Sequence, residues 1–146
     1  MTIRAAHFAD LDTSTLYALL RLRVDVFVVE QRCPYPELDG RDVEAGTVHL
    51  WAEEGGAPVS YLRVLAGDPA RIGRVCTAAT HRGARLSARL LAAALELIGD
   101  RPCVLDAQAY LTGFYERFGF VATGPEFDDD GIPHVPMVRE GQPRSR

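Results

Sequence analysis

The sequence predicts an α/β protein in which a mixed β-sheet carries helices on its faces. In the middle of the chain, segments with apolar residues at helical spacing alternate with short apolar segments typical of buried strands. Hairpin signals lie near both ends, which indicates antiparallel pairs on either side of the alternating part. A length of 146 residues suits one domain with one core, and we expect that domain to span residues 1–146.

The N-terminal third predicts one strand followed by one helix. Residues 3–8 have the composition of a short strand. Apolar residues then recur at spacings of three and four, which predicts a helix over residues 14–29. Its N-cap oxygen has three candidates, Asp12, Thr13 and Ser14. Two prolines in segment 31–46 preclude a continuing regular helix, so we expect a long loop there.

The rest of the chain predicts a hairpin and then alternating elements. Residues 48–54 and 57–66 flank Gly55-Gly56, a pattern typical of an antiparallel hairpin. The elements expected after it are a strand over 71–77, a helix over 84–98, a strand over 102–109, a helix over 111–118, and closing strands over 120–123 and 134–140. We expect the acidic segment 126–133 to form the turn between the closing strands.

Composition excludes several classes of protein. The net charge of -4 argues against a general nucleic-acid binder. The absence of lysine excludes Schiff-base chemistry and a P-loop. Three widely spaced cysteines and four scattered histidines form no disulfide framework or zinc motif, so we expect no metal. No apolar run approaches the ~20 residues of a membrane span and no signal peptide is visible, so we expect a cytoplasmic protein without a membrane partner.

One strand–loop–helix segment, residues 72–99, indicates an anion site. The first N–H groups of a helix lack partners and carry the positive end of the helix dipole. Arg82 and Arg85 add full charges beside them, while Gly83 and its small neighbours allow close approach to the backbone. These features favour a phosphate or pyrophosphate. The alternative is that Gly83 merely permits a turn and the arginines are solvated.

Two motifs in this region carry a resemblance. "VCTAATHRGARLSARLL" followed by "AQAYLTGFYERFGFVATG" resembles the GCN5-related N-acetyltransferases (GNAT), which have a [QR]xxGx[GA] loop and then an FYxxxGF segment. Arg82 matches the basic position, whereas Arg85 replaces the first glycine and Ser87 replaces Gly or Ala. The FYxxxGF match is complete, at Phe114, Tyr115, Gly119 and Phe120. "LYALLRLRVDVFVVEQRCPYPELDGRD" and "DDDGIPHVPMVRE" look like the ElaA-type subgroup.

The resemblance implies a fold and a donor. The fold would be a mostly antiparallel sheet of six or seven strands, with helices on both faces and a cofactor cleft where the fourth and fifth strands splay. The acyl donor would be acetyl-CoA. Its pantetheine would pair with backbone of Val75, Cys76 and Thr77. Its pyrophosphate would bind the loop formed by Arg82, Gly83, Ala84, Arg85, Leu86 and Ser87.

Acetyl transfer to an amine needs a proton donor for the departing thiolate and an acceptor for the amine proton. Tyr115 is the candidate donor, because a phenol near the sulfur can protonate it; it would also contact the cofactor. The alternative is a tyrosine at the edge of a core helix. Glu30 and His134 are the first candidates for the base, since Glu30 borders the acceptor region in this superfamily and imidazole changes charge near neutrality.

The acceptor pocket is predicted on the loop after the first helix. Tyr35 and Asp39 could contact a cationic substrate, together with Glu30. A ring of carboxylates near that side would favour an amine by electrostatics: Glu30, Glu37, Asp39 and Asp42. The alternative is a rigid surface loop in which proline fixes the path.

The sequence thus predicts an N-acetyltransferase that moves an acetyl group from acetyl-CoA to a primary amine by direct attack on the thioester. The alternative is a non-catalytic acyl-CoA-binding or sensing module, for which the departures at Arg85 and Ser87 are the only support. The acceptor could be a small molecule or a peptide. Edge strands near the C-terminus could pair two copies in a homodimer.

Overall fold

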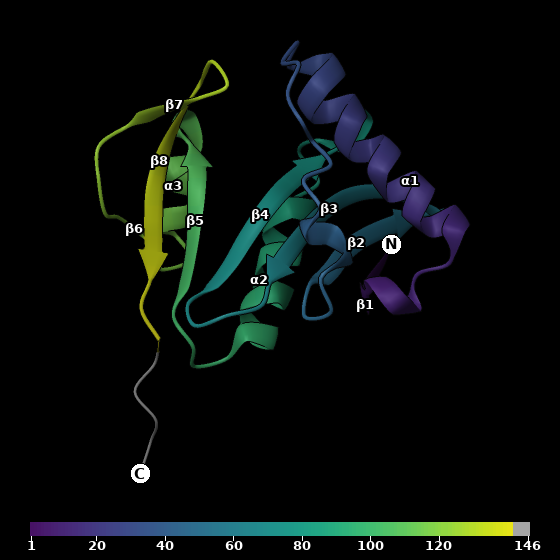
Figure 1. Cartoon of the computed structure of the whole chain (residues 1–146), viewed down its shortest axis with the longest axis horizontal. Coiled ribbons are helices and arrows are strands. Elements are labelled where there is room, and N and C mark those ends of the chain that lie inside the picture. The colour runs from purple at the N-terminus through teal and green to yellow at the C-terminus, as the bar shows by residue number, and fades with distance from the viewer. Residues whose placement is uncertain (142–146) are drawn as a thin grey trace.

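The structure is a computed structural model that describes residues 1–141, and it contains one eight-stranded sheet. The strands run in the order β1-β2-β3-β4-β5-β8-β6, and β7 pairs with β8 (Figure 1). Every neighbouring pair is antiparallel except β4 and β5. The strands are β1 (Thr2–His7), β2 (Val48–Glu54), β3 (Ala57–Leu65), β4 (Ala70–Thr77), β5 (Cys103–Gln108), β6 (Val121–Ala122), β7 (Phe127–Asp129) and β8 (Ile132–Arg139).

Three α-helices accompany the sheet, and short helical turns join several elements. The helices are α1 (Thr13–Val24), α2 (Leu86–Ile98) and α3 (Thr112–Glu116). Helix α1 continues without a break into a π-helical segment, Asp25–Glu30, and Asp12 accepts a capping hydrogen bond from the Thr15 N–H at 2.7 Å. The 3₁₀ turns are Phe8–Asp10, Arg41–Val43, Ala79–His81 and Ala109–Leu111.

Successive side chains along β2 and β3 point to opposite faces of the sheet, and each face packs against a helix. Leu50 and Leu62 belong to the larger core, which contains the buried face of α2 and Tyr115 from α3. Trp51 and Tyr61 belong to a second core that Leu19 and its neighbours on α1 complete. This is the period of two expected of strands buried on both faces.

The sheet separates into two parts between β4 and β5. These parallel strands pair only at Ala70 with Cys103 and at Arg71 with Val104, and beyond that point they diverge (Figure 1). Strand β4 also carries a β-bulge: Tyr61 faces Cys76 and Arg63 faces Gly73, so one residue of β3 opposes two residues of β4. A bulge bends its strand, which helps to turn β4 away from β5.

The predicted fold class is confirmed, with three differences in detail. The sheet has eight strands, where six or seven were expected. Segment 126–133, predicted as a turn, contains strand β7 and a tight hairpin to β8. Asp130 and Gly131 both have positive φ, 51° and 84°, which is the geometry of the Asp-Gly turns that suit hairpins. The second helix begins at Leu86 rather than at Ala84, because Arg85 has left-handed backbone geometry.

Candidate active site

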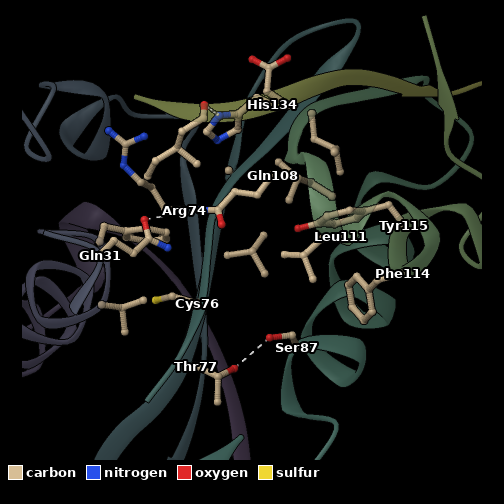
Figure 2. A pocket seen from close by; sticks show the side chains of 18 of the residues that line it. Gln31, Arg74, Cys76, Thr77, Ser87, Gln108, Leu111, Phe114, Tyr115 and His134 are labelled. Atoms are coloured by element: carbon tan, nitrogen blue, oxygen red, sulfur yellow. Dashed lines mark hydrogen bonds between the residues drawn. The ribbon is translucent and has the colours of Figure 1, made fainter. Parts of the chain in front are cut away.

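A cavity of about 1040 Å³ lies where β4 and β5 diverge. Its walls come from the end of the first helix, from β4, from the loop before α2, from β5 with α3, and from the β7–β8 hairpin. Figure 2 shows side chains from these segments arranged around one space, with Cys76 and Arg74 on one side and Tyr115 on the other. The fold therefore brings together residues that are a hundred positions apart.

The exposed edge of β4 forms one wall of the cavity. Val75, Cys76 and Thr77 all line it, beyond the last residue pair between β4 and β5. Burial raises the pKa of the Cys76 thiol to about 12. The sulfur is therefore a protonated thiol at neutral pH and is poorly suited to act as a nucleophile.

A chain of hydroxyl groups ties this strand to α2. The Ser60 and Thr77 hydroxyls lie 2.8 Å apart. The Thr77 and Ser87 hydroxyls also lie 2.8 Å apart (Figure 2). Ser87 replaces the small residue of the loop motif, and its hydroxyl is used to fix the first turn of α2 against β4.

The loop before α2 keeps the conformation that its motif requires despite the missing glycine. Gly83 has φ of +89°, and Arg85, at the glycine position, has φ of +58° in the left-handed region. Arg85 is the N-cap residue and makes no side-chain capping bond, so the first N–H groups of α2 remain available toward the cavity. All predicted loop residues line the cavity except Ala84.

Arg82 and Glu30 form an ion pair at the cavity wall. Arg82 Nη2 donates to Glu30 Oε1 at 2.6 Å, and Nη1 donates to the other carboxylate oxygen. Nε and Nη2 of Arg82 also donate to the Thr77 carbonyl at 3.2 and 3.1 Å. The hydrogen bond from Arg82 holds the pKa of Glu30 below its ordinary value, which weakens this carboxylate as a base.

Tyr115 lies on α3 with its phenol directed into the cavity (Figure 2). Its ring packs edge-to-face against Phe114 and Phe120, with centroids 5.0 and 6.1 Å apart. Burial raises the pKa of the Tyr115 phenol above its ordinary value near 10. At neutral pH the group therefore carries its proton and can donate a hydrogen bond.

His134 lies on β8, opposite Gln108 of β5, and lines the cavity (Figure 2). Its ring stacks on Phe127 with centroids 6.0 Å apart. Nδ1 lies 2.8 Å from the Ile132 carbonyl oxygen. Because a carbonyl can only accept, Nδ1 carries the proton, and in the neutral ring Nε2 has the lone pair.

Two contacts join the parts of the chain on either side of the cleft. Gln108 Nε2 donates to Gln31 Oε1 at 3.5 Å (Figure 2). The Cys33 thiol donates to the Asp130 carbonyl at 3.2 Å. The loop after the first helix is thereby linked to β5 and to the β7–β8 hairpin.

The buried arginine cluster, which comprises Arg23, Arg63, Arg74, Glu37, Asp39 and Asp42, adjoins the cavity, and its members Arg63 and Arg74 line it beside Tyr35. Three guanidinium groups meet three carboxylates, so its formal charge is zero. The contacts are Arg23 Nε–Glu37 Oε2 at 2.6 Å, Arg23 Nη1–Asp42 Oδ1 at 2.7 Å, Arg63 Nη1–Asp42 Oδ1 at 3.0 Å, Arg63 Nη2–Asp39 Oδ2 at 2.5 Å and Arg74 Nε–Glu37 Oε1 at 2.9 Å. Tyr35 donates its phenol proton to Glu37 and lies beneath the Arg74 guanidinium.

These contacts correct the expectation of an acidic ring. Each of its four carboxylates is paired with arginine, and Asp39 does not line the cavity. The hydrogen bond from Arg63 holds the pKa of Asp39 well below its usual range. For Asp42, burial acts to raise the pKa, but hydrogen bonds and charge from Arg23 and Arg63 outweigh it and the pKa is lowered. Tyr35 and Glu30 remain at the cavity wall.

Sequence reasoning did not identify Arg74, Gln31 or Gln108, which lie on a strand and at element ends without any motif. A signal existed for Arg23. It follows Leu19 by four positions and so lies on the apolar side of the predicted helix, where an arginine needs buried carboxylate partners. The structure buries its side chain completely.

Two further properties concern residues 1–141. In this part of the chain no helix is long and apolar enough to cross a membrane. Across the same residues, no group of three or more His, Cys, Asp or Glu side chains is arranged to hold a metal ion.

Comparison with known proteins gives a consistent set of similarities. A family profile described as the acetyltransferase (GNAT) domain matches residues 23–140. A UPF0039 protein of Mycobacterium tuberculosis is 54% identical over 95% of this chain and 93% of its own length. The crystal structure of Escherichia coli ElaA superposes with a TM-score of 0.90 at 39% identity, over 95% of this chain and 99% of that one. An acyl-CoA N-acyltransferase from Pseudomonas aeruginosa gives a TM-score of 0.86 at 44% identity, over 94% and 98% of the two chains.

Proposed function

The chain belongs to the GNAT acetyltransferases, within the ElaA-like group, and from this premise we propose that it transfers the acetyl group of acetyl-CoA to a primary amine. One observation carries the proposal. The exposed edge of β4, the uncapped start of α2 and the Tyr115 phenol all face the cavity between β4 and β5. A thioester held along that edge would lie within the same space as a proton donor.

The residues of the cavity fit a CoA donor. Backbone groups of Val75, Cys76 and Thr77 can pair with the two amides of pantetheine, as a neighbouring strand would. The start of α2, with Arg82 and Arg85 beside it, supplies N–H groups and positive charge for a pyrophosphate. When bound, acetyl-CoA supplies the thioester that the amine attacks.

Tyr115 is the proposed proton donor. Its raised pKa keeps the phenol protonated, and its packing against Phe114 and Phe120 fixes the direction of the O–H group. A thiolate that leaves within the cavity can take this proton or accept a hydrogen bond from it.

His134 is the proposed base. The hydrogen bond from Nδ1 to the Ile132 carbonyl fixes the ring and leaves the lone pair on Nε2, which can accept a proton from the amine directly or through water. Glu30, the other predicted base, is engaged by Arg82 and has a lowered pKa. Glu30 must lose Arg82 before it can accept a proton, whereas Nε2 of His134 already has a lone pair, and we therefore assign the base to His134.

The acceptor would bind at the end of the cavity where the loop after the first helix meets the β7–β8 hairpin. Tyr35, Gln31 and Gln108 line that end of the cavity and can hydrogen-bond a polar amine or a peptide group. A cytoplasmic location and a homodimer formed by edge strands stay predictions, which cell fractionation and light scattering would test.

The test is a thiol-release assay with acetyl-CoA and a broad panel of amines. We expect Tyr115→Phe to lower kcat by about 100-fold, since general acid catalysis contributes about 10²–10⁴, and to leave the Kd for CoA within about twofold. Tyr110→Phe is the matched control, because Tyr110 also lines the cavity but is 79% exposed.

The same assay separates this proposal from the alternative of a non-catalytic acyl-CoA-binding module. Such a module would bind CoA in calorimetry, release no thiol with any amine of the panel, and respond equally to the Tyr115 and Tyr110 variants. That combination would refute acetyl transfer. Turnover that survives Tyr115→Phe unchanged would refute only the role of the phenol.

A further inference from the structure

Within residues 1–141, the Glu30–Arg82 pair is the one contact in which a residue proposed to bind the cofactor is held by a carboxylate of the cavity wall. Arg82 makes two hydrogen bonds to Glu30 and two to the Thr77 carbonyl. Its guanidinium therefore extends from the end of β4 to the π-helical segment that follows α1. All three residues line the cavity.

This arrangement competes with the cofactor in two ways. The carboxylate of Glu30 faces the guanidinium as a phosphate oxygen pair would, since both bind it through two parallel hydrogen bonds. The Thr77 carbonyl is also one of the backbone groups proposed to pair with pantetheine, and here it already accepts from Arg82. Bidentate binding of the pyrophosphate requires Arg82 to leave Glu30, and pairing of the Thr77 carbonyl with pantetheine through the same lone pair requires Arg82 to leave Thr77 as well.

Exchanging Glu30 for a phosphate as the partner of Arg82 costs little free energy. The side chains of Arg82 and Glu30 are 46% and 41% exposed. Ion pairs exposed to water contribute little to stability, because solvent screens them and holding two long side chains costs entropy. A doubly charged pyrophosphate beside the start of α2 can therefore displace a single carboxylate.

We propose that Glu30 is a positioning residue that occupies Arg82 in place of the cofactor's pyrophosphate and releases it when CoA binds. The inference rests on the proposed function, in which Arg82 contacts the pyrophosphate. Glu30 keeps the arginine at the cavity in a defined orientation, at the expense of cofactor affinity. Its release on cofactor binding also returns a free carboxylate to the acceptor side of the cavity.

The experiment is a double-mutant cycle on CoA binding, measured by isothermal titration calorimetry. Glu30→Gln removes the charge and keeps the shape of the side chain. We expect it to tighten CoA binding about threefold to fivefold, the range that corresponds to an exposed ion pair. Arg82→Gln should weaken binding about tenfold through the lost charge-assisted bonds. In the Arg82→Gln background, Glu30→Gln should change the Kd by less than about twofold.

Asp25→Asn is the matched control. Asp25 lies in the same π-helical segment and pairs with Arg21 at 3.9 Å, away from the cavity lining. The Asp25→Asn substitution removes the same charge without altering a partner of Arg82. The Kd of this variant for CoA should equal that of the native chain. Far-UV circular dichroism verifies that each variant is folded.

The possible outcomes distinguish the proposed role of Glu30 from the assignment of Arg82 to the pyrophosphate. If Glu30→Gln tightens binding equally with and without Arg82, the effect is general charge repulsion and the proposal is wrong. An unchanged Kd for Glu30→Gln also overturns it, while leaving the pyrophosphate contact intact. If Arg82→Gln does not weaken CoA binding, the pyrophosphate assignment itself fails. Absence of thiol release from the native chain, in the assay that includes Tyr115→Phe, bears on acetyl transfer alone.

Discussion

The molecule uses arginine–carboxylate pairing in two places that differ chiefly in burial. In the buried arginine cluster, Arg23 is fully buried and Glu37 has only 3% of its side chain exposed. At the Glu30–Arg82 pair, both side chains are more than two-fifths exposed. The hydrogen-bond lengths are alike, yet the energetic consequences of breaking the two contacts differ greatly.

The difference shows that water access, rather than contact geometry, decides whether an ion pair is permanent. Removing one member of a buried pair leaves a charge without solvent or partner, which is strongly unfavourable. An exposed pair exchanges its partner for water at little cost. The buried cluster can therefore hold the loop after the first helix in place, whereas Arg82 can exchange its partner for water.

The largest expected effect is that of Arg23→Met. This change leaves Glu37 and Asp42 short of a partner in the protein interior, and we expect the free energy of unfolding to fall by about 3–5 kcal/mol. Urea denaturation measures it. A loss below about 1 kcal/mol would mean that water reaches the cluster, and the contrast between the two regions would disappear.

Acidification should reveal the same contrast. The pKa values of Asp39 and Asp42 are lowered in the folded chain, so the unfolded chain takes up protons first. Their stabilisation is complete above about pH 4, the value of a free aspartate, and decreases as the pH falls below it. Denaturation at pH 5, 4 and 3 should show a smaller pH slope for Asp42→Asn than for the native chain, and only a slight decrease in slope for Glu30→Gln, because the lowered pKa of Glu30 is that of an exposed group. Equal slopes in all three proteins would contradict this.

Arg85→Gly tests the cofactor loop. Arg85 has left-handed geometry at φ of +58°, which glycine adopts without strain. We expect the free energy of unfolding to rise by about 0.5–1 kcal/mol. If Arg85 also binds phosphate, the Kd for CoA rises in the same variant. A variant that is less stable than the native chain would indicate that the arginine side chain supports the loop.

The smallest expected effect is that of Arg82→Gln on stability. Because the Glu30–Arg82 pair is exposed, we expect the free energy of unfolding to change by less than about 1 kcal/mol. Measured beside Arg23→Met under the same conditions, this variant sets the lower end of the comparison. A loss as large as that of Arg23→Met would mean that Arg82 is a structural residue and is not free to exchange.

The sequence was sufficient for features with a local or periodic signal. Apolar spacing predicted α1, α2 and the β2–β3 hairpin, and the FYxxxGF segment led to Tyr115. It was insufficient for β7, because three consecutive aspartates favour a turn, while the backbone pairing with β8 does not depend on side-chain type. The residue pattern of β3 and β4 also did not reveal the bulge beside Arg74.

The buried arginine cluster could not be predicted from the sequence, for a different reason. Arg23 and Asp42 are nineteen residues apart, and Arg74 and Glu37 are thirty-seven apart. Their pairing depends on how the loop after the first helix packs on the sheet. Considered one at a time, the carboxylates of this loop predicted an acidic surface for a cation. Only the tertiary contacts show that each carboxylate is paired with an arginine.

The parting of β4 and β5 after two residue pairs has a mechanical consequence. Strands β4 and β5 form two arms that are joined by backbone pairing only at a short pivot near Ala70 and Cys103. Side-chain contacts connect the two sides again through Gln31–Gln108 and Cys33–Asp130. Backbone amides along the inner side of β4 should then exchange their hydrogens faster than those of β3. A bound ligand that bridges the arms would slow this exchange and stiffen the pivot.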